Sequence, residues 1–308
     1  MASPLAEAEV VRVRASGKIN LALRSGPRRP DGYHRLATVF QAVSVFDELD
    51  ARWADAGEFS ITVEGEQAEL VPADDSNLAV KAARLLAREY GAGGVGCALE
   101  LRKTIPVTGG MAGGSADAAA ALLACSVLWD LDTSPDDLLE LGAKLGADVP
   151  FCLAGGTAMG TGRGDRLAPV LSRGSYQWVL AMDDGELSTP EVFRRFDELH
   201  PTGSAALEVP PSLLNALISG DPVALGQSLV NDLEPAAVSL RPQLGRVLRA
   251  GRELGALGAL VSGSGPTVAF LVADERAAID LSVGLASEGL GRAIRRVHGP
   301  VPGARLIS

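Results

Sequence analysis

A glycine-rich segment between a predicted strand and a predicted helix constrains this chain more than any other feature. Residues 106–115, PVTGGMAGGS, follow an alternation of apolar and polar residues over 95–103 and precede an alanine-rich run over 116–128. Glycines allow the backbone to approach a ligand closely, and N–H groups at a helix N-terminus attract an anion. We therefore predict a phosphate cradle. It lacks the GK[ST] ending of a Walker A loop, and a glycine-rich turn needed only for packing is the alternative.

The rest of the chain mixes strands and helices without regular alternation. Period-two patterns and short apolar runs predict strands over 10–15, 95–103, 176–182, 257–261 and 267–272. Helical spacing and end signals predict helices over 77–90, 116–128, 134–146, 190–199 and 242–254. Asp75 or Ser76 is the expected cap of the first helix, and 203–211 the expected exposed loop. This mixture favours an α+β fold, with domains over 1–172 and 173–308.

Composition limits the partners of the chain. Its 308 residues, 47% of them hydrophobic, can build a real core, and 28 basic against 38 acidic residues give a net charge of −10. Such a charge argues against binding DNA or an anionic membrane through general electrostatics. The longest apolar stretch, 118–129, is too short to span a bilayer, and the N-terminus has no signal-peptide pattern. We expect a cytoplasmic protein with no nucleic-acid or membrane partner.

Two further sequence patterns carry no prediction of a site. Gly91, Gly93 and Gly96 form a GxGxxG, but a predicted helix precedes it and a strand follows. A dinucleotide fingerprint needs the reverse order, so we interpret these glycines as a helix end running into a turn. The three cysteines form no CxxC and have no histidine nearby, which indicates reduced thiols rather than zinc ligands or disulfides.

Lysine is rare, which draws attention to two of its positions. Lys18 and Lys103 are two of only four lysines; Lys18 follows the first strand and Lys103 precedes the glycine-rich segment. Lysine offers a compact point charge to a reacting oxygen, although a surface charge is the alternative for each. Asp148, within LGADVPF, lies beside apolar residues where a carboxylate needs a partner. The alternative role for Asp148 is the N-cap of a following helix.

Five motifs together resemble a known superfamily. SGKINLAL, DGYHRL, PVTGGMAGGSADAA, LGADVPF and SGSGPT occur in the order and spacing of the GHMP kinases, over about residues 13–272. DGYH and GADVPF are similar to the branch that acts on a cytidylyl methylerythritol diphosphate in the non-mevalonate isoprenoid pathway. The resemblance implies a ribosomal S5 domain 2-like N-terminal half and a ferredoxin-like C-terminal half with the site between them. It also implies phosphoryl transfer from ATP, with Mg²⁺, to the 2-hydroxyl of this small-molecule substrate.

The resemblance also implies roles for particular residues. Asp148 would be the base that accepts the hydroxyl proton, and Lys18 would hold it ionised. The implied nucleotide site comprises Asn77, Lys103, Pro106, Val107, Thr108, Gly109, Gly110, Met111, Ala112, Gly113, Gly114, Ser115 and Ala116, with Ser115 as the candidate Mg²⁺ contact. The implied substrate site comprises Asn20, Tyr33, His34, Thr189, Phe193, Gly263 and Gly265, with the cytosine between the rings of Tyr33 and Phe193.

The chain departs from the superfamily pattern at four positions. Thr108 and Ala112 stand where glycine is common, so we expect both at negative φ. Ala116-Asp117 replaces Ser-Asn, and Asp117 would repel a phosphate if it pointed inward. Alternative functions are another GHMP kinase of the homoserine or mevalonate type, or an inactive relative that binds a nucleotide or sugar. We expect a monomer or weak homodimer.

Overall fold

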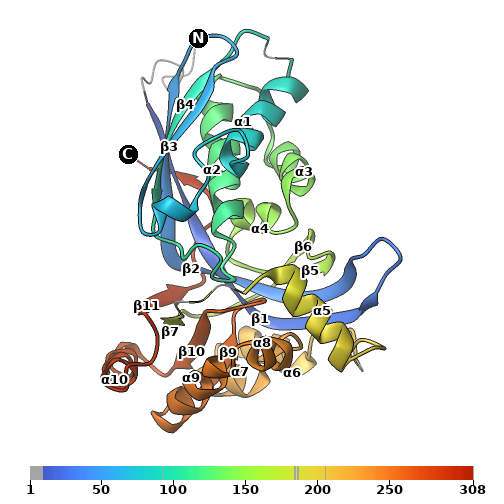
Figure 1. Ribbon diagram of the computed structural model, residues 1–308, viewed down its shortest axis with the longest axis vertical. Coiled ribbons are helices and arrows are strands. Elements are labelled where there is room, and N and C mark those ends of the chain that lie inside the picture. The colour runs from blue at the N-terminus through green and yellow to red at the C-terminus, as the bar shows by residue number, and fades with distance from the viewer. Residues whose placement is uncertain (1–9, 92, 184, 186, 205, 308) are drawn as a thin grey trace.

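The computed structural model describes residues 10–91, 93–183, 185, 187–204 and 206–307, which fold around two β-sheets stacked end to end (Figure 1). The first sheet has the strands β1 (Val11–Arg28), β2 (His34–Trp53), β3 (Phe59–Gly65), β4 (Cys97–Lys103), β5 (Thr157–Gly162), β6 (Arg166–Pro169), β8 (Val230–Asn231) and β12 (Arg305–Leu306). The second is antiparallel, in the order β11 (Ala293–Gly299), β7 (Tyr176–Met182), β10 (Val268–Val272) and β9 (Gly258–Val261). The predicted α+β class is confirmed.

Helices cover one face of the first sheet and both faces of the second. The first sheet packs against α1 (Leu78–Glu89), α2 (Gly113–Leu128), α3 (Pro135–Leu145) and α4 (Val149–Ala154), and a short 3₁₀ turn, η1 (Ala68–Leu70), follows β3. The second half contains α5 (Thr189–Leu199), α6 (Pro211–Ser219), α7 (Pro222–Ser228), α8 (Glu234–Leu240), α9 (Pro242–Glu253) and α10 (Glu275–Ser287). No helix in these described ranges is both long and apolar enough to cross a membrane.

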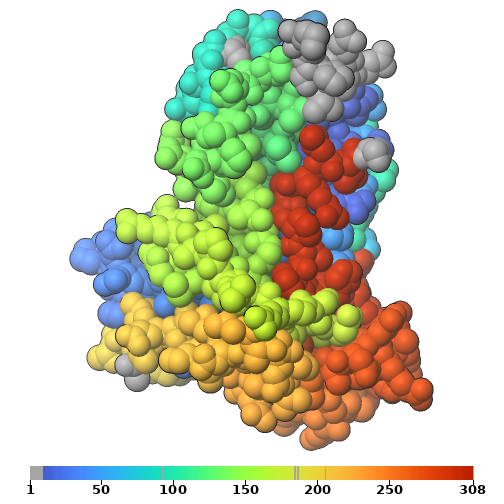
Figure 2. All heavy atoms as spheres, turned by 180° about the vertical axis from the view of Figure 1, so that it is seen from behind, coloured from blue at the N-terminus to red at the C-terminus, as the bar shows by residue number. Residues whose placement is uncertain are grey.

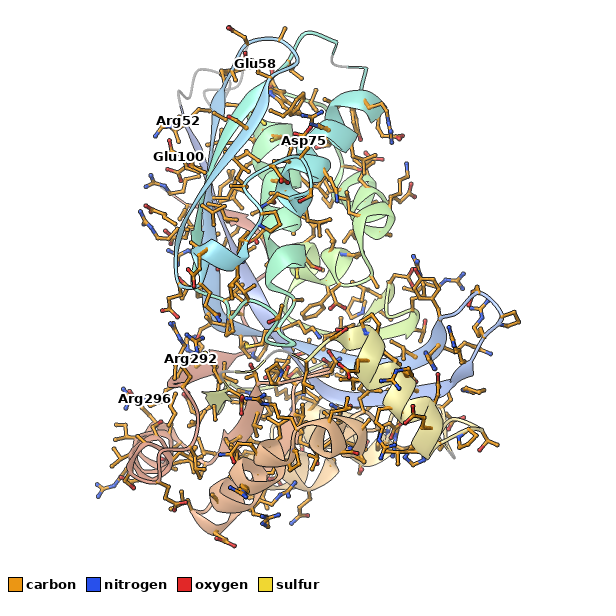
Figure 3. All side chains as sticks on the ribbon, in the orientation of Figure 1. Arg52, Glu58, Asp75, Glu100, Arg292 and Arg296 are labelled. Carbon is orange, nitrogen blue, oxygen red and sulfur yellow. The ribbon has the colours of Figure 1, made fainter. Side chains whose placement is uncertain are left out.

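The first sheet is buried on its helix side and charged on the other. Val11, Val13 and Ala15 of β1 point into the core against α2. The opposite face carries ion pairs between neighbouring strands, such as Arg52 Nε to Glu100 Oε1 at 3.3 Å, and these side chains project away from the helices (Figure 3). This alternation is what antiparallel strands with one solvated face require, and β1, β2 and β4 pair in this way.

A long hairpin connects the first sheet to the site. β1 and β2 pair from Val11 with Ala51 to Arg28 with His34, with irregularities after Ser16, Asn20 and Ser25. β5 pairs with the outer half of β2, so the hairpin extends beyond the helices. Lys18 and Asn20 therefore lie in the middle of β1, where the two halves of the molecule meet.

The last described strand pairs with the first. Leu306 of β12 pairs with Val13 of β1, and Pro302 forms a bridge with Gly155. In Figure 2 this last segment, in red, lies over the first half. The predicted boundary near residue 172 precedes β7, the first strand of the second sheet; as a domain boundary it stays a prediction.

Several predicted elements are confirmed, with one correction at a cap. The strand predicted over 176–182 coincides with β7, and Ser134 caps α3 by accepting the N–H of Asp137. The cap of α1 is Asn77 rather than Asp75 or Ser76, because its Oδ1 accepts the N–H of Ala79 at 2.8 Å. Gly91, at φ +61°, follows α1, as the helix-end interpretation requires. The predicted loop over 203–211 includes residue 205, outside the described residues, and its last residue already begins α6.

The backbone of the glycine-rich segment contradicts one prediction. Thr108 and Ala112 have φ of +55° and +60°, not negative values. A non-glycine residue pays roughly 1–2 kcal/mol in this left-handed region. The surrounding contacts hold the loop in its glycine-type shape nonetheless: the N–H of Ala116 donates to the carbonyl of Ala112 at 2.9 Å, and the N–H of Lys18 donates to that of Met111 at 3.1 Å.

Candidate active site

A cleft of about 740 Å³ lies between the two halves. It brings together most of the site residues that the sequence predicts. Those on its walls are Lys18, Asn20, Asn77, Lys103, Pro106, Val107, Thr108, Gly109, Gly110, Ala112, Gly113, Gly114, Ser115, Asp148, Thr189, Phe193 and Gly263. Met111 and Ala116 are buried beneath the loop, whereas Tyr33 and His34 line an adjoining pocket of about 680 Å³, here called the side pocket.

Lys18 and Asp148 meet across the cleft, although 130 positions separate them in the sequence. The ammonium of Lys18 lies 3.6 Å from Asp148 Oδ2. The side chain of Lys18 is only 6% exposed, while that of Asp148 is 33% exposed. Asp148 precedes α4 but makes no side-chain cap hydrogen bond. Its carboxylate is therefore available to the cleft, which removes the N-cap alternative.

A short polar chain fixes Lys18. Its ammonium donates to Asn20 Oδ1 at 2.8 Å, and Asn20 Nδ2 donates to Thr38 Oγ1 at 2.8 Å. Thr38 in turn donates to the carbonyl of Ala22 at 2.6 Å. All three side chains are buried. Thr38, which the sequence analysis missed, thus orients Asn20 with its carbonyl toward Lys18.

The four glycines of the cradle differ in what surrounds them. A Cβ on Gly110 would collide with the carbonyl oxygen of Ser262, and one on Gly109 would lie 2.7 Å from Cβ of Pro106. A Cβ on Gly113 would lie 3.3 Å from both Ile105 and the ammonium of Lys103. Only a Cβ on Gly114 would meet nothing within 4 Å. Packing therefore requires three of these glycines, and Gly114 is the one that faces open space.

The N-terminus of α2 offers uncapped donors. Ala112 is its N-cap residue and has no side chain that could accept from the first N–H groups. These N–H groups carry the positive end of the helix dipole. Ser115, half-buried in the first turn, adds a hydroxyl on the cleft wall. This arrangement fits an anion, as the cradle prediction requires.

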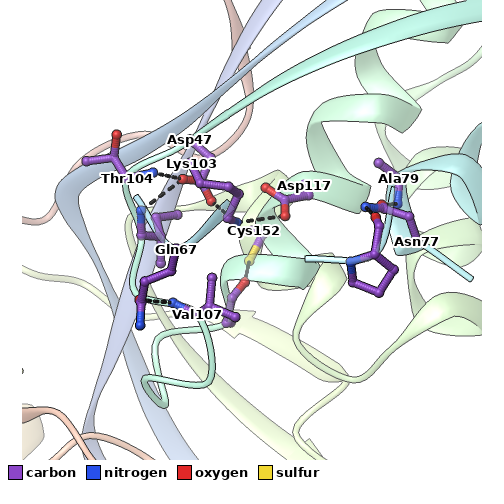
Figure 4. A network of polar contacts seen from close by, with 12 residues as sticks. Asp47, Gln67, Asn77, Ala79, Lys103, Thr104, Val107, Asp117 and Cys152 are labelled. Carbon is purple, nitrogen blue, oxygen red and sulfur yellow. Dashed lines mark hydrogen bonds and ion pairs between the residues drawn. The ribbon is translucent and has the colours of Figure 1, made fainter. Parts of the chain in front are cut away.

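Lys103 lies in a buried ion cluster rather than free in the cleft (Figure 4). Its ammonium donates to Asp117 Oδ2 at 2.7 Å and to Asp47 Oδ2, and all three side chains are at most 4% exposed. Asp47 also accepts the N–H groups of Thr104 and Ile105, whereas Asp117 Oδ1 has no hydrogen-bond partner among the described residues. Burial, only partly offset by Lys103, raises the pKa of Asp117 well above its usual value. Asp117 thus binds Lys103 instead of projecting toward a phosphate.

Asn77 has a local structural role. Its Oδ1 caps α1, and its Nδ2 donates to the carbonyl of Pro72 at 2.7 Å (Figure 4). Both ends of the amide are therefore engaged within the chain. Asn77 shapes the wall of the cleft, and any contact of its side chain with a nucleotide stays a prediction.

The side pocket has aromatic walls and an oriented histidine. His34 stacks on Phe193, with ring centroids 4.7 Å apart, and its Nε2 lies 2.7 Å from Asp197 Oδ1. A carboxylate only accepts, so Nε2 carries a hydrogen, and in the neutral imidazole Nδ1 is then an acceptor. Tyr33 is 56% exposed. Asp197, which the sequence analysis missed, lies four residues after Phe193 on α5 and so shares its face.

The second half closes the site through the loop over 262–265. Ser262 Oγ donates to the carbonyl of Gly110 at 3.1 Å, and Thr189 Oγ1 lies 2.9 Å from Ser264 Oγ. A Cβ on Gly263, at φ +57°, would lie 3.4 Å from the ammonium of Lys18. Gly265 instead packs against side chains of its own half. Gly263 is therefore the glycine that approaches the reacting groups.

Comparisons with known proteins decide the family. Models of the GHMP kinases N terminal domain and of the GHMP kinases C terminal region match residues 77–156 and 213–289. The 4-diphosphocytidyl-2-C-methyl-D-erythritol kinase of Nocardia farcinica is 53% identical over 298 residues, covering 96% of each chain. That of Cutibacterium acnes is 51% identical over 301 residues, covering 96% of this chain and 97% of the relative. This chain belongs to that kinase family.

Comparison with solved structures shows the same fold. A crystal structure of 4-(cytidine 5'-diphospho)-2C-methyl-D-erythritol kinase superposes with a TM-score of 0.76 at 33% identity, covering 93% of this chain and 98% of that one. A homoserine kinase from Cytophaga hutchinsonii reaches the same TM-score at 20% identity, covering 100% and 99%, and shows the fold alone. The two-domain GHMP kinase fold is confirmed, and the chain is an ATP-dependent small-molecule kinase.

Two neighbouring glycines at the start of α2 give a matched pair of variants: Gly114 is exposed and Gly113 is buried. Gly114→Val places a side chain in the open cradle, so we expect ATP affinity to fall about tenfold or more, equivalent to about 1.4 kcal/mol, with little change in Tm. Gly113→Val presses on Ile105 and Lys103, so we expect a lower Tm. Calorimetric titration with a non-hydrolysable ATP analogue and thermal unfolding measure both. Unchanged ATP affinity in folded Gly114→Val would contradict the cradle.

The raised pKa of Asp117 gives a pH-dependent stability. Because the folded protein holds this proton more tightly than the unfolded chain, Asp117 favours folding at low pH, and that contribution is lost as pH rises through the raised pKa. Asp117→Asn cannot ionise, so the variant does not lose this stability as pH rises. We expect the stability of the variant relative to wild type to rise between pH 5 and pH 8 by on the order of 1 kcal/mol, since one unit of pKa difference between the folded and unfolded states corresponds to about 1.4 kcal/mol.

The measurement is denaturant unfolding of both proteins across this pH range. Asp47→Asn is the control, since Asp47 accepts two backbone N–H groups besides Lys103, and it should lose stability instead. If the stability of Asp117→Asn relative to wild type were equal at pH 5 and pH 8, ionisation of the buried carboxyl would not be the cause of the difference.

Proposed function

We infer that this protein transfers the γ-phosphoryl group of ATP to the 2-hydroxyl of 4-diphosphocytidyl-2-C-methyl-D-erythritol. The observation that carries this inference is the Lys18–Asp148 pair, 3.6 Å apart on the cleft wall. The glycine cradle lines the same cleft, and the aromatic side pocket adjoins it. A phosphate donor and a base-bearing acceptor therefore both have a place beside the same carboxylate.

Asp148 is proposed as the general base. It accepts the proton of the acceptor hydroxyl as that oxygen forms its bond to the γ-phosphorus, while the bond from phosphorus to the bridging oxygen breaks and releases ADP. Lys18 keeps the carboxylate ionised and stabilises negative charge on the reacting oxygens. Phosphoryl transfer needs mainly positioning and charge stabilisation, and Asn20, held by Thr38, positions Lys18.

Mg²⁺ is proposed as the metal. In the described ranges, no group of three or more His, Cys, Asp and Glu side chains could hold a metal ion. Mg²⁺ in kinases is commonly bound by one or two protein oxygens and by phosphates rather than by a protein cage, and Ser115 Oγ is an oxygen of this kind on the cleft wall. Bound there, the ion would neutralise charge on the phosphates.

The side pocket supports cytosine as the base. Tyr33 and Phe193 offer ring faces, and His34 Nδ1 is an acceptor in the neutral imidazole, because Nε2 is bonded to Asp197. The exocyclic amino group of cytosine is a donor, whereas uracil has a carbonyl oxygen at that position. A stacked aromatic contact contributes roughly 1–3 kcal/mol per base but accepts any base, so His34 would supply the discrimination.

This pocket also separates the proposal from the alternatives. Homoserine and mevalonate have no base to stack in it. An inactive relative would not need Lys18 and Asp148 held together. We further propose that the enzyme works in the cytoplasm, where ATP and small phosphorylated metabolites occur, as a monomer or weak homodimer.

The test compares acceptors. With ATP and Mg²⁺, we expect phosphorylation of the cytidylyl substrate and none of homoserine or mevalonate, with the uridylyl analogue at least tenfold poorer in kcat/KM, equivalent to about 1.4 kcal/mol. His34→Ala should remove most of this preference and leave KM for ATP near the wild-type value. Product identification by mass spectrometry completes the assay. Faster phosphorylation of homoserine or mevalonate would contradict the proposal.

A further inference from the structure

The side pocket is strongly basic, although the chain as a whole is acidic. Four basic side chains line it: Arg28, Lys144, Arg163 and Arg194. Its only carboxylate, among the described residues, is that of Asp197, which bonds to His34. Three of these cations pair with carboxylates outside the pocket, Lys144 with Glu89, Arg194 with Glu198 and Arg163 with Asp165. The walls of the pocket still carry more basic than acidic side chains in a protein with a net charge of −10, which favours an anionic ligand. Cytosine is neutral, so the base does not account for it.

Only one of these four cations also lines the main cleft. Arg163 borders both the cleft and the side pocket, whereas Arg28, Lys144 and Arg194 border the side pocket alone. The other cations of the cleft are engaged: Lys18 contacts Asp148 and Asn20, and Lys103 contacts two buried aspartates. Arg163 is therefore the basic residue at the passage between the two cavities.

Local contacts hold Arg163 in this place. It lies in the turn between β5 and β6, where its Nε and Nη2 donate to Asp165 Oδ2 at 3.2 and 3.1 Å. Its guanidinium carbon lies 5.5 Å from the centroid of the Tyr33 ring. No described residue accepts from Nη1, and the side chain is 44% exposed. One edge of the guanidinium is thus anchored, and the other is open to a ligand.

The proposed substrate has its own anion between its two ends. Its cytidine belongs in the side pocket and its methylerythritol hydroxyl belongs beside Asp148, so the diphosphate that links them must cross the passage at Arg163. A guanidinium fork matches phosphate oxygens in charge and geometry. We propose that Arg163 binds the diphosphate of the acceptor and so joins base recognition to the position of the reacting hydroxyl; this inference rests on the proposed function.

The contact with Tyr33 suggests a different role that the experiment must separate. If Arg163 served only to hold Tyr33, its loss would weaken every ligand that stacks on Tyr33, with or without phosphates. If it binds the diphosphate, its loss weakens only phosphate-bearing ligands. Cytidine and CDP differ in this single respect, so they are the probes.

Both probes are titrated by calorimetry into enzyme saturated with a non-hydrolysable ATP analogue, which keeps CDP out of the ATP site. We expect wild-type enzyme to bind CDP more tightly than cytidine. Arg163→Ala should lower CDP affinity about tenfold or more, the range for a charge-assisted hydrogen bond, and cytidine affinity less than about twofold. Arg163→Lys should restore part of the CDP affinity. Arg166→Ala, which changes the exposed first residue of β6 that lines neither cavity, should change neither.

Two different failures can be told apart. Equal losses of cytidine and CDP affinity in Arg163→Ala, or no loss of either, would overturn the role of Arg163 and leave the proposed function standing. Absence of binding of both probes to wild-type enzyme would overturn the cytosine pocket, the proposed function and this inference together.

Discussion

The active site depends on the close approach of two loops, one from each half of the molecule. Gly110 of the first half lies so near the loop over 262–265 that any Cβ there would collide with Ser262. The carbonyl of Gly110 accepts the hydroxyl of Ser262 at 3.1 Å. This contact brings Gly263 to the ammonium of Lys18. A larger residue at position 110 would separate the halves and open the cleft.

Charge is distributed so that an acidic protein can bind two polyanions. The fixed donors at the start of α2 need no basic side chain in the cradle, because the helix terminus itself supplies the positive potential. Lys103, which would otherwise be a free cation there, is engaged by Asp47 and Asp117 and anchors the strand before the loop to the helix after it. Lys18 lies beside the reacting oxygens, where it contacts Asp148, and Arg163 at the passage keeps one edge of its guanidinium open beside its pairing with Asp165.

The sequence predicts regular elements and motif residues well, and contacts between distant segments poorly. The strand-like stretch over 176–182 located β7, and motif order brought Lys18 and Asp148 to one site before any distance was known. β1 was predicted only at its start because both faces are buried beyond Ala15, so the alternation disappears. Positive φ at Thr108 was missed because tertiary contacts overrule the preference of a single residue. Asp47 gives no local signal, whereas Asp197 could have been found from its spacing to Phe193.

The central claim is that Asp148, held by Lys18, takes the proton while the cradle binds ATP independently. Asp148→Asn keeps the size of the side chain and removes the base. The most direct measurement is the single-turnover rate of phosphoryl transfer in this variant, with ATP affinity measured separately by calorimetry. We predict that the rate falls by about 10²–10⁴-fold, the usual contribution of a positioned base, and that ATP affinity changes by less than about threefold. A near wild-type rate would contradict the account.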